Sequence, residues 1–420
     1  MENRLILHVG LQKTGTTAIQ SFLEINTNIL KRQRVNYIIN PTRLYMAWPI
    51  YRNREDATVP VEELWKPIKL SLQHSSVMYS NESFSNIVEE RPEFVLDLTK
   101  LLPENPITII VYIRRQDLHY ESLYGQNIVH GEFRKFNPSP SDDYMIFDYG
   151  QTTKVYEYSR WLNIMSDHLR PQDKLVVRVY ERGAFESGSI FNDFISAGGL
   201  QWDPEFTIPE KTVNVSLDGR FIELARKMAS FYKINGPKNY NFHFESSFLW
   251  VTLKTINEAI GITGNKRLFS RTERIEFMKK YEDTNNSVSK KFFNNKKPLF
   301  DESDLYSTAN NEKDRFKEGE CEMALILLNK LWIDIACLAK FRVLNYMRLK
   351  YYLKKRKYDR SFNTKWRCFF HKTIQSLGKR TVKNWGSVPQ MENELYTLSS
   401  EVTKTECLID EYHKFIQNDE

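Results

Sequence analysis

The sequence predicts an α/β fold in which helices cover both faces of a mostly parallel β-sheet. Short apolar runs alternate with longer segments of helical periodicity along the first half of the chain. The clearest strand is 107–113, ITIIVYI, because it is rich in β-branched residues, carries no charge and lies between Pro106 and Arg114. Uninterrupted apolar strands are typical of parallel sheets, whose ligands bind in the loops at the carboxyl ends of the strands.

The remaining elements follow in order along the chain. The run RLILHV at 4–9 indicates a buried strand, which a glycine-containing loop connects to a helix expected over 16–30. Further strands are expected at 76–80 and 174–180, and further helices at 116–129, 151–169, 188–197, 216–232 and 271–292. Three stretches without a clear period are expected to be loops that shape a substrate pocket: 43–60, 131–150 and 236–250.

The composition is that of a soluble globular protein. Of 420 residues, 41% are hydrophobic and 27% are charged, which excludes a mostly disordered chain and a collagen-like one. No stretch of about 18 residues lacks charge, so a membrane-spanning helix is not expected. The start, MENRLILHVG, has no basic region before a long apolar core, so we expect no signal peptide and a cytoplasmic location.

The loop after the first strand is the most informative segment, and it reads GLQKTGTT over 10–17. Glycines let the backbone curl so that several N–H groups point inward, and a helix N-terminus adds unpaired donors and about half a positive charge. Lys13 supplies a full charge, and Thr16 and Thr17 supply hydroxyl donors. This combination predicts a site for an anion of the size of phosphate and a P-loop-type sheet.

The spacing of this loop differs from that of nucleotide triphosphatases. In their pattern, GxxxxGK[ST], a lysine directly follows the second glycine. Here Thr16 follows Gly15, and Lys13 lies two residues before that glycine. We therefore do not expect a bound metal, although a small-molecule kinase that uses ATP and Mg²⁺ remains the alternative function.

The run KTGTT resembles the 5′-phosphosulfate loop of sulfotransferases that use 3′-phosphoadenosine 5′-phosphosulfate (PAPS), and is most similar to that of bacterial carbohydrate sulfotransferases. A second match supports the resemblance. In that family a strand ends in Arg, and a Ser eight residues later lies on the next helix; Arg114 and Ser122 have this spacing. Weaker similarity at 177–200 and 285–303 extends the resemblance over about residues 4–305.

The resemblance implies transfer of a sulfuryl group from PAPS to a hydroxyl or amine of a carbohydrate or glycolipid, with no metal. It implies that Arg114 and Ser122 hold the 3′-phosphate, in agreement with the bidentate grip that Arg offers to phosphate. Lys13 would stabilise the leaving phosphate. The rest of the loop would bind the 5′ side of the nucleotide: Gln12, Thr14, Gly15, Thr16 and Thr17. The presence of Lys13 and Arg114 argues against a non-catalytic binding protein.

The general base, which would remove the proton from the hydroxyl or amine that becomes sulfated, has no motif of its own. Glu82 is the first candidate, since it follows the strand at 76–80, and the carboxyl ends of parallel strands meet at one edge of a sheet. Its alternative role is that of an acid at a helix N-terminus. His8, His119 and His130 are further candidates for the base.

The C-terminal part differs in composition, so we expect a domain over 1–310 and a helical, basic extension over 311–420. Residues 318–341 indicate a core-packed helix, and 340–384 hold fifteen Lys and Arg and one acid, interleaved with aromatics. This pattern suits an anionic membrane surface, such as the inner membrane where lipid-linked glycans are built. Nucleic-acid binding is not expected, because the rest of the chain is net acidic. All four cysteines lie beyond residue 320, fit no metal signature and should stay reduced.

Overall fold

The computed structural model describes residues 2–39, 61–82, 84–129, 134–146, 152–209 and 267–306, together with residues 219, 222, 223 and 226. One compact unit spans 1–124, 136–216 and 269–312, and contains nearly all of the described elements. The second unit comprises 125–135, 217–268 and 313–420. Within it, Arg226 forms an ion pair with Glu223 at 2.5 Å. The predicted extension 311–420, the expected loops 43–60 and 236–250, and His130 lie outside the described residues.

The first unit is an α/β fold built on a parallel sheet, as the sequence predicted, and the sheet has five strands. The strands are β1 (Leu5–Val9), β2 (Val35–Tyr37), β3 (Ser76–Asn81), β4 (Ile107–Ile113) and β5 (Lys174–Val179), in the spatial order β2-β3-β1-β4-β5. Every residue of β1 and β4 is buried, which explains why these two strands are uninterrupted apolar runs. The edge strand β5 is partly exposed.

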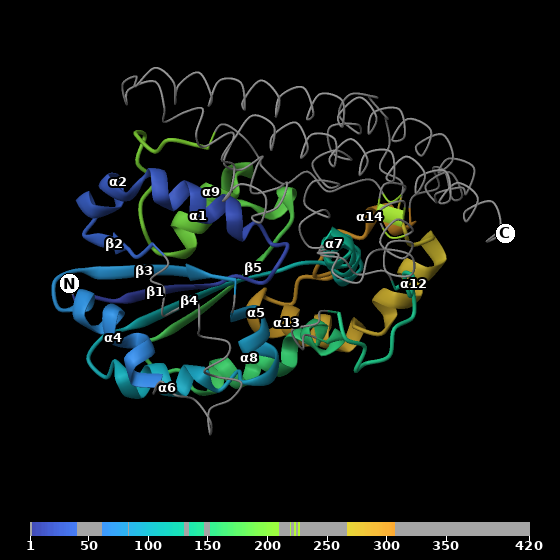
Figure 1. Ribbon diagram of the computed structural model, residues 1–420, viewed down its shortest axis with the longest axis horizontal. Helices are drawn as coiled ribbons and strands as arrows, with labels where there is room; N and C mark the ends of the chain where they lie inside the picture. Colours follow the sequence, from blue (N-terminus) through green and yellow to red (C-terminus); the bar gives the residue numbers. More distant parts are fainter. Residues whose placement is uncertain are drawn as a thin grey trace, which may run out of the picture. The chain divides into compact units, whose positions relative to one another are not determined.

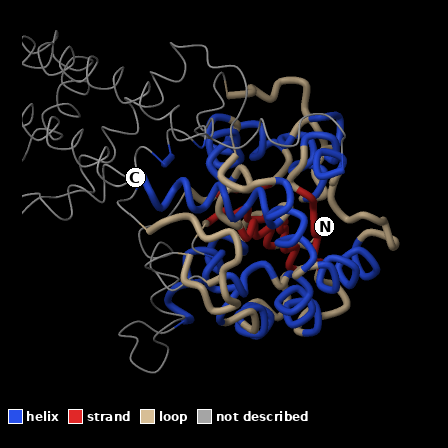
Figure 2. Tube along the Cα trace, turned by 90° about the vertical axis from the view of Figure 1, so that its right-hand side faces the viewer, coloured by secondary structure: helices blue, strands red, loops and turns tan. Residues whose placement is uncertain are grey.

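Helices cover both faces of the sheet (Figure 1). One face carries α1 (Thr16–Ile25), α2 (Thr27–Arg32) and α9 (Ile190–Ala197), and the other carries α4 (Val61–Leu72), α6 (Phe94–Leu101) and α8 (Tyr158–Asp167). Further helices are α5 (Phe84–Glu90), α7 (Gln116–Val129), α12 (Arg271–Lys279), α13 (Glu282–Phe292) and α14 (Ser303–Tyr306), and short 3-10 turns include η2 (Thr153–Tyr156). Figure 2 shows the strands enclosed by helices.

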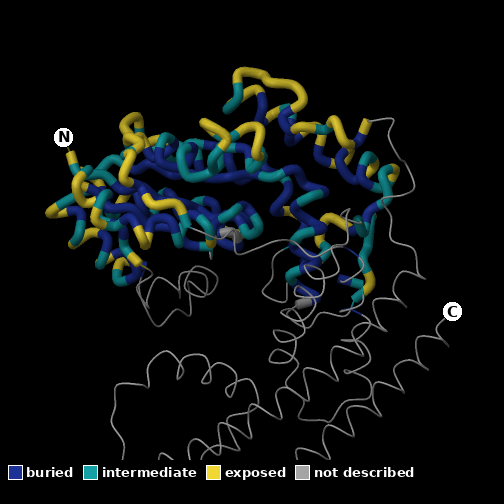
Figure 3. The backbone as a smooth tube through the Cα atoms, turned by 90° about the horizontal axis from the view of Figure 1, so that it is seen from above, coloured by how far each residue is buried: buried dark blue, intermediate teal, exposed yellow. Residues whose placement is uncertain are grey.

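The core lies in two layers, one on each face of the sheet. Ile6 of β1 packs in a cluster with Ile19 and Phe194, whereas Leu5 and Leu7 belong to the cluster on the opposite face. This division follows from the alternation of side chains along a strand. The buried residues run through the centre of the fold and the exposed ones lie at its periphery (Figure 3).

Three of the predicted helices are each divided into two elements in the structure. The helix expected over 16–30 breaks at Asn26, whose amide nitrogen donates to the carbonyls of Phe22 and Thr207 at 2.8 Å each. The helix expected over 271–292 is divided between α12 and α13 at Tyr281. The segment 151–169 likewise divides into η2 and α8. Long-range contacts such as that with Thr207 compete with local periodicity, so the pattern alone could not reveal these breaks.

Candidate functional site

The loops that follow β1, β3 and β4 meet at the carboxyl edge of the sheet. Val9 of β1 pairs with Asn81 of β3 and with Val111 of β4, so the three strands end at nearly the same level. The strand order shows that the chain leaves β1 toward β2 and leaves β4 toward β5. Connections that diverge in this way open a crevice between the two strand ends, where ligands of such sheets bind.

Two glycines allow the loop between β1 and α1 to close. Gly15 has a φ of 81°, and a Cβ there would lie 2.6 Å from Ile190 Cδ1 and 2.8 Å from Tyr180 Cε2. A Cβ on Gly10 would lie 2.6 Å from Thr16 Cγ2. Helix α1 starts immediately after Gly15, without a side-chain cap. Its first N–H groups therefore have no capping side chain, which leaves them suited to an anion.

The threonines of the loop have different surroundings. Thr14 Oγ1 donates to the carbonyl oxygen of Leu11 at 2.6 Å, and Thr16 Oγ1 donates to the same oxygen at 3.3 Å. Both side chains are buried, whereas Thr17 is exposed and Gln12 is partly exposed. The hydroxyls of Thr14 and Thr16 thus stabilise the loop itself. Gln12, Lys13, Thr17 and the backbone N–H groups are the donors of the loop that the described contacts leave for a ligand.

Lys13 and Glu82 lie within electrostatic reach of each other. Burial lowers the pKa of Lys13, while the Glu82 carboxylate raises it and the Arg114 guanidinium lowers it further. Burial also raises the pKa of Glu82, against the opposing effects of Lys13 and of a hydrogen bond with Thr16. The end of β3 therefore brings a carboxylate with a raised pKa to the loop. A raised pKa and a position beside the bound ligand are properties that general bases share.

Arg114 follows β4 and reaches back to the loop. Its Nη1 donates to the carbonyl oxygen of Lys13 at 2.9 Å, and its guanidinium lies over the Tyr180 ring, 5.5 Å from the centroid. Tyr180, which follows β5, was not identified from the sequence; an aromatic residue directly after a strand was the available signal. Arg114, Leu118 and Ser122 are partly exposed, while the residues between them are buried. Leu118 and Ser122 thus lie on one accessible stripe of α7, in keeping with the helical repeat, and Arg114 lies just before this helix begins.

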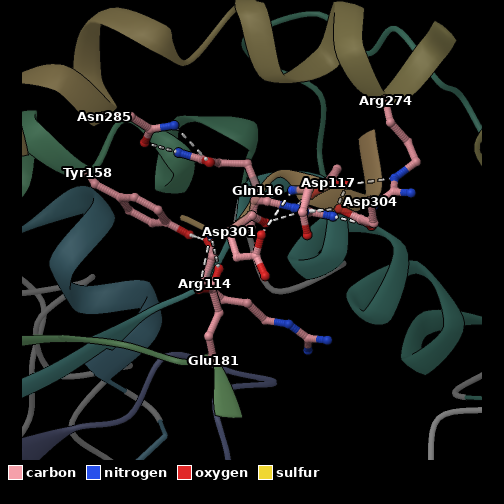
Figure 4. A network of polar contacts seen from close by, with 11 residues as sticks. Arg114, Gln116, Asp117, Tyr158, Glu181, Arg274, Asn285, Asp301 and Asp304 are labelled. Atoms are coloured by element: carbon pink, nitrogen blue, oxygen red, sulfur yellow. Dashed lines mark hydrogen bonds and ion pairs between the residues drawn. The ribbon is translucent and has the colours of Figure 1, made fainter. Parts of the chain in front are cut away.

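The neighbouring arginine has the opposite surroundings. Arg115 is buried and belongs to an ion network with Asp117, Arg274 and Asp304 (Figure 4). Arg115 Nε lies 2.8 Å from Asp117 Oδ1, and Arg274 Nε lies 2.7 Å from Asp117 Oδ2. Asp304 contacts both arginines, at 2.5 Å and 2.6 Å.

This network links the start of α7, where Arg115 and Asp117 lie, to α12 and α14. Burial acts to raise the pKa of Asp304, but hydrogen bonds from Arg115 and Arg274 outweigh it and hold that pKa well below its usual range. Figure 4 shows the Arg114 side chain pointing away from Asp117 and Asp304. Of two adjacent arginines, one is therefore structural and the other extends toward the loop.

Two of the candidate histidines are buried. His8 Nδ1 lies 2.8 Å from Ser80 Oγ, and burial lowers the pKa of His8 to about 3. His119 Nδ1 lies 3.3 Å from the Tyr158 hydroxyl, and burial together with the charges of Arg114 and Lys13 lowers the pKa of His119 to about 3. Both rings are fully inaccessible to solvent, at 0% exposure. Of the candidate bases that the structure describes, Glu82 is the one that is partly exposed.

The part of the chain that the structure describes contains no group of three His, Cys, Asp or Glu that could hold a metal ion. Among the same residues, no helix is long and apolar enough to cross a membrane.

Comparisons with known proteins give one partial relative. No family model matches the chain, and no solved structure matches it. The chain is 26% identical over 223 residues to an uncharacterized protein of Archaeoglobus fulgidus. The match covers 52% of this chain and 54% of that protein, so the chain spans about half the length of the curated relative it matches.

Proposed function

We propose that the protein is a PAPS-dependent sulfotransferase with a P-loop-type sheet and a carbohydrate or glycolipid acceptor. One observation supports this most directly: the hydrogen bond from Arg114 Nη1 to the backbone carbonyl of Lys13 brings the arginine that follows β4 to the loop that follows β1. Two separate anion-binding groups in one crevice suit a nucleotide with phosphates at both its 3′ and 5′ positions. A site for a single phosphate would not require the second group.

The described side chains account for each part of the transfer. An acceptor oxygen attacks sulfur, the bond from sulfur to the 5′-phosphate oxygen breaks, and the acceptor proton passes to the Glu82 carboxylate. The nucleotide leaves as 3′-phosphoadenosine 5′-phosphate (PAP), whose added negative charge Lys13 and the α1 N-terminus stabilise. Glu82 suits proton removal because burial raises its pKa and thereby its basicity.

A kinase is the second candidate, and one contact favours it. Glu82 follows β3 and forms a hydrogen bond with Thr16 at the start of α1. In P-loop kinases and related enzymes, a loop Ser or Thr and an acidic residue together hold Mg²⁺. The displaced position of Lys13, two residues before Gly15, argues for the sulfotransferase.

Calorimetric titration distinguishes the two functions. We expect the wild-type protein to bind PAP without metal and to prefer it to ATP with Mg²⁺. Arg114→Ala should weaken PAP binding about tenfold to a hundredfold, the loss of one charge-assisted contact with phosphate. Arg32→Ala is the matched control, because Arg32 is 52% exposed and precedes β2 at the opposite edge of the sheet. Preference for ATP with Mg²⁺ would establish the kinase instead.

We also propose that residues 340–384 bring the enzyme to an anionic membrane on the cytoplasmic side. The fifteen basic residues of this segment are the support for this proposal. The full chain should sediment with vesicles that contain phosphatidylglycerol at low salt, and dissociate from them as salt is raised. Equal sedimentation with neutral vesicles would contradict the proposal.

A further inference from the structure

The main chain of Arg114 is held on both sides of its Cα. The Tyr158 hydroxyl donates to the carbonyl oxygen of Arg114 at 2.6 Å, and Tyr180 N donates to the carbonyl oxygen of Ile113 at 2.7 Å. These two bonds orient the peptide planes that flank Arg114. Because the planes set the direction of the Cα–Cβ bond, they also set where the guanidinium can reach. Figure 4 shows the Tyr158 hydroxyl directed at the Arg114 backbone.

Tyr158 is a buried donor with a buried neighbour. Its side chain is 0% exposed at the start of α8, and its hydroxyl lies 3.3 Å from His119 Nδ1. The His119 ring is neutral because burial lowers its pKa to about 3. In the tautomer that carries its proton on Nδ1, the ring donates to the Tyr158 oxygen, and the Tyr158 proton is then directed to Arg114.

We propose that Tyr158 is a positioning residue for the 3′-phosphate of the nucleotide, an inference that rests on the proposed function. Tyr158 acts through Arg114, because its hydroxyl fixes the position of the Arg114 carbonyl. The Arg114 side chain is in turn held by its hydrogen bond to the Lys13 carbonyl and by its contact with the Tyr180 ring. A side chain with several rotatable bonds is thereby ordered before the ligand arrives, which reduces the entropy lost on binding. The Tyr158 hydroxyl itself has no described contact with residues 10–17, the loop that would bind the 5′ side of the nucleotide.

The test compares two nucleotides that differ only in the 3′-phosphate. Tyr158→Phe removes the hydroxyl and keeps the ring. We expect it to weaken binding of PAP about threefold to tenfold, the effect of one lost hydrogen bond. Binding of adenosine 5′-phosphate should be unchanged. Tyr120→Phe is the matched control, because Tyr120 is also buried and its hydroxyl also donates to a carbonyl, that of Asn137, at 3.0 Å.

A second measurement separates positioning from a general structural role. In an Arg114→Ala background, Tyr158→Phe should have no further effect on PAP affinity, since the residue through which Tyr158 acts is gone. An equal loss of affinity for both nucleotides, or an undiminished effect in the Arg114→Ala background, would overturn the inference, as would wild-type affinity in Tyr158→Phe. A wild-type protein that binds both nucleotides equally would instead overturn the proposed function, before any variant is compared.

Discussion

Asp117 should be the most sensitive acid of the buried ion network. Its carboxylate is fully buried and accepts from Arg115 Nε at 2.8 Å, from Arg115 Nη2 at 3.1 Å and from Arg274 Nε at 2.7 Å. Asp117→Asn preserves the shape of the side chain but removes the negative charge. The four side chains then carry a net positive charge instead of none, and an amide group faces two guanidinium groups.

The magnitude follows from burial. Breaking a buried ion pair by removing one partner costs about 3–5 kcal/mol. The lower end of this range applies to Asp117, because Asp304 still contacts both arginines. Asp304 contacts the same two arginines at similar distances, but its side chain is 47% exposed. Water can replace it, so Asp304→Asn should cost only about 1 kcal/mol. The two substitutions therefore make the same chemical change in different surroundings.

Urea unfolding of the full chain at neutral pH, followed by tryptophan fluorescence, measures the difference. Trp65 and Trp161 are buried on the same face of the sheet and report on the unit that contains the network. We expect the free energy of unfolding to fall about 3 kcal/mol in Asp117→Asn, and clearly less in Asp304→Asn. Equal losses in the two variants would refute the reasoning, because burial would then not decide the cost.

Three further outcomes are expected. Gly15→Ala should weaken PAP binding in calorimetry more than it lowers thermal stability, because a Cβ there meets Tyr180 and the backbone has a φ of 81°. Burial raises the pKa of Glu89 from 4.5 to about 7. Between these two pH values, the folded protein keeps a proton on Glu89 that the unfolded chain has already lost. The free energy of unfolding should fall by about 3 kcal/mol as pH rises through this range, and Glu89→Gln should abolish that fall in urea titrations. Glu82→Gln should slow conversion of PAPS to PAP about 10²- to 10⁴-fold with little change in PAP affinity; near-normal turnover would exclude Glu82 as the base.

Several elements could be predicted because their signals are local. The strand at 107–113 and the helix at 116–129 have the predicted bounds in the structure, since a charge-free β-branched run and a helical repeat need no distant partner to be recognised. Strand β2 was not predicted, because its three residues, VNY, have no apolar run of their own and pair only through β3. Helix α4 was also not predicted, and it contains Pro67 in its interior.

The sequence by itself determined the chemistry that is present: glycines at the ends of a loop, a lysine within it, and two arginines after a buried strand. Only the tertiary structure decided how these groups are used. It directed Arg114 toward Lys13 and committed Arg115 to Asp117, because the second ion partner, Arg274, comes from a helix more than 150 positions along the chain. It also brought Glu82 to the loop through the pairing of β1 with β3. Residue type and spacing are local properties, whereas the partner that a charge finds depends on which strands and helices pack together.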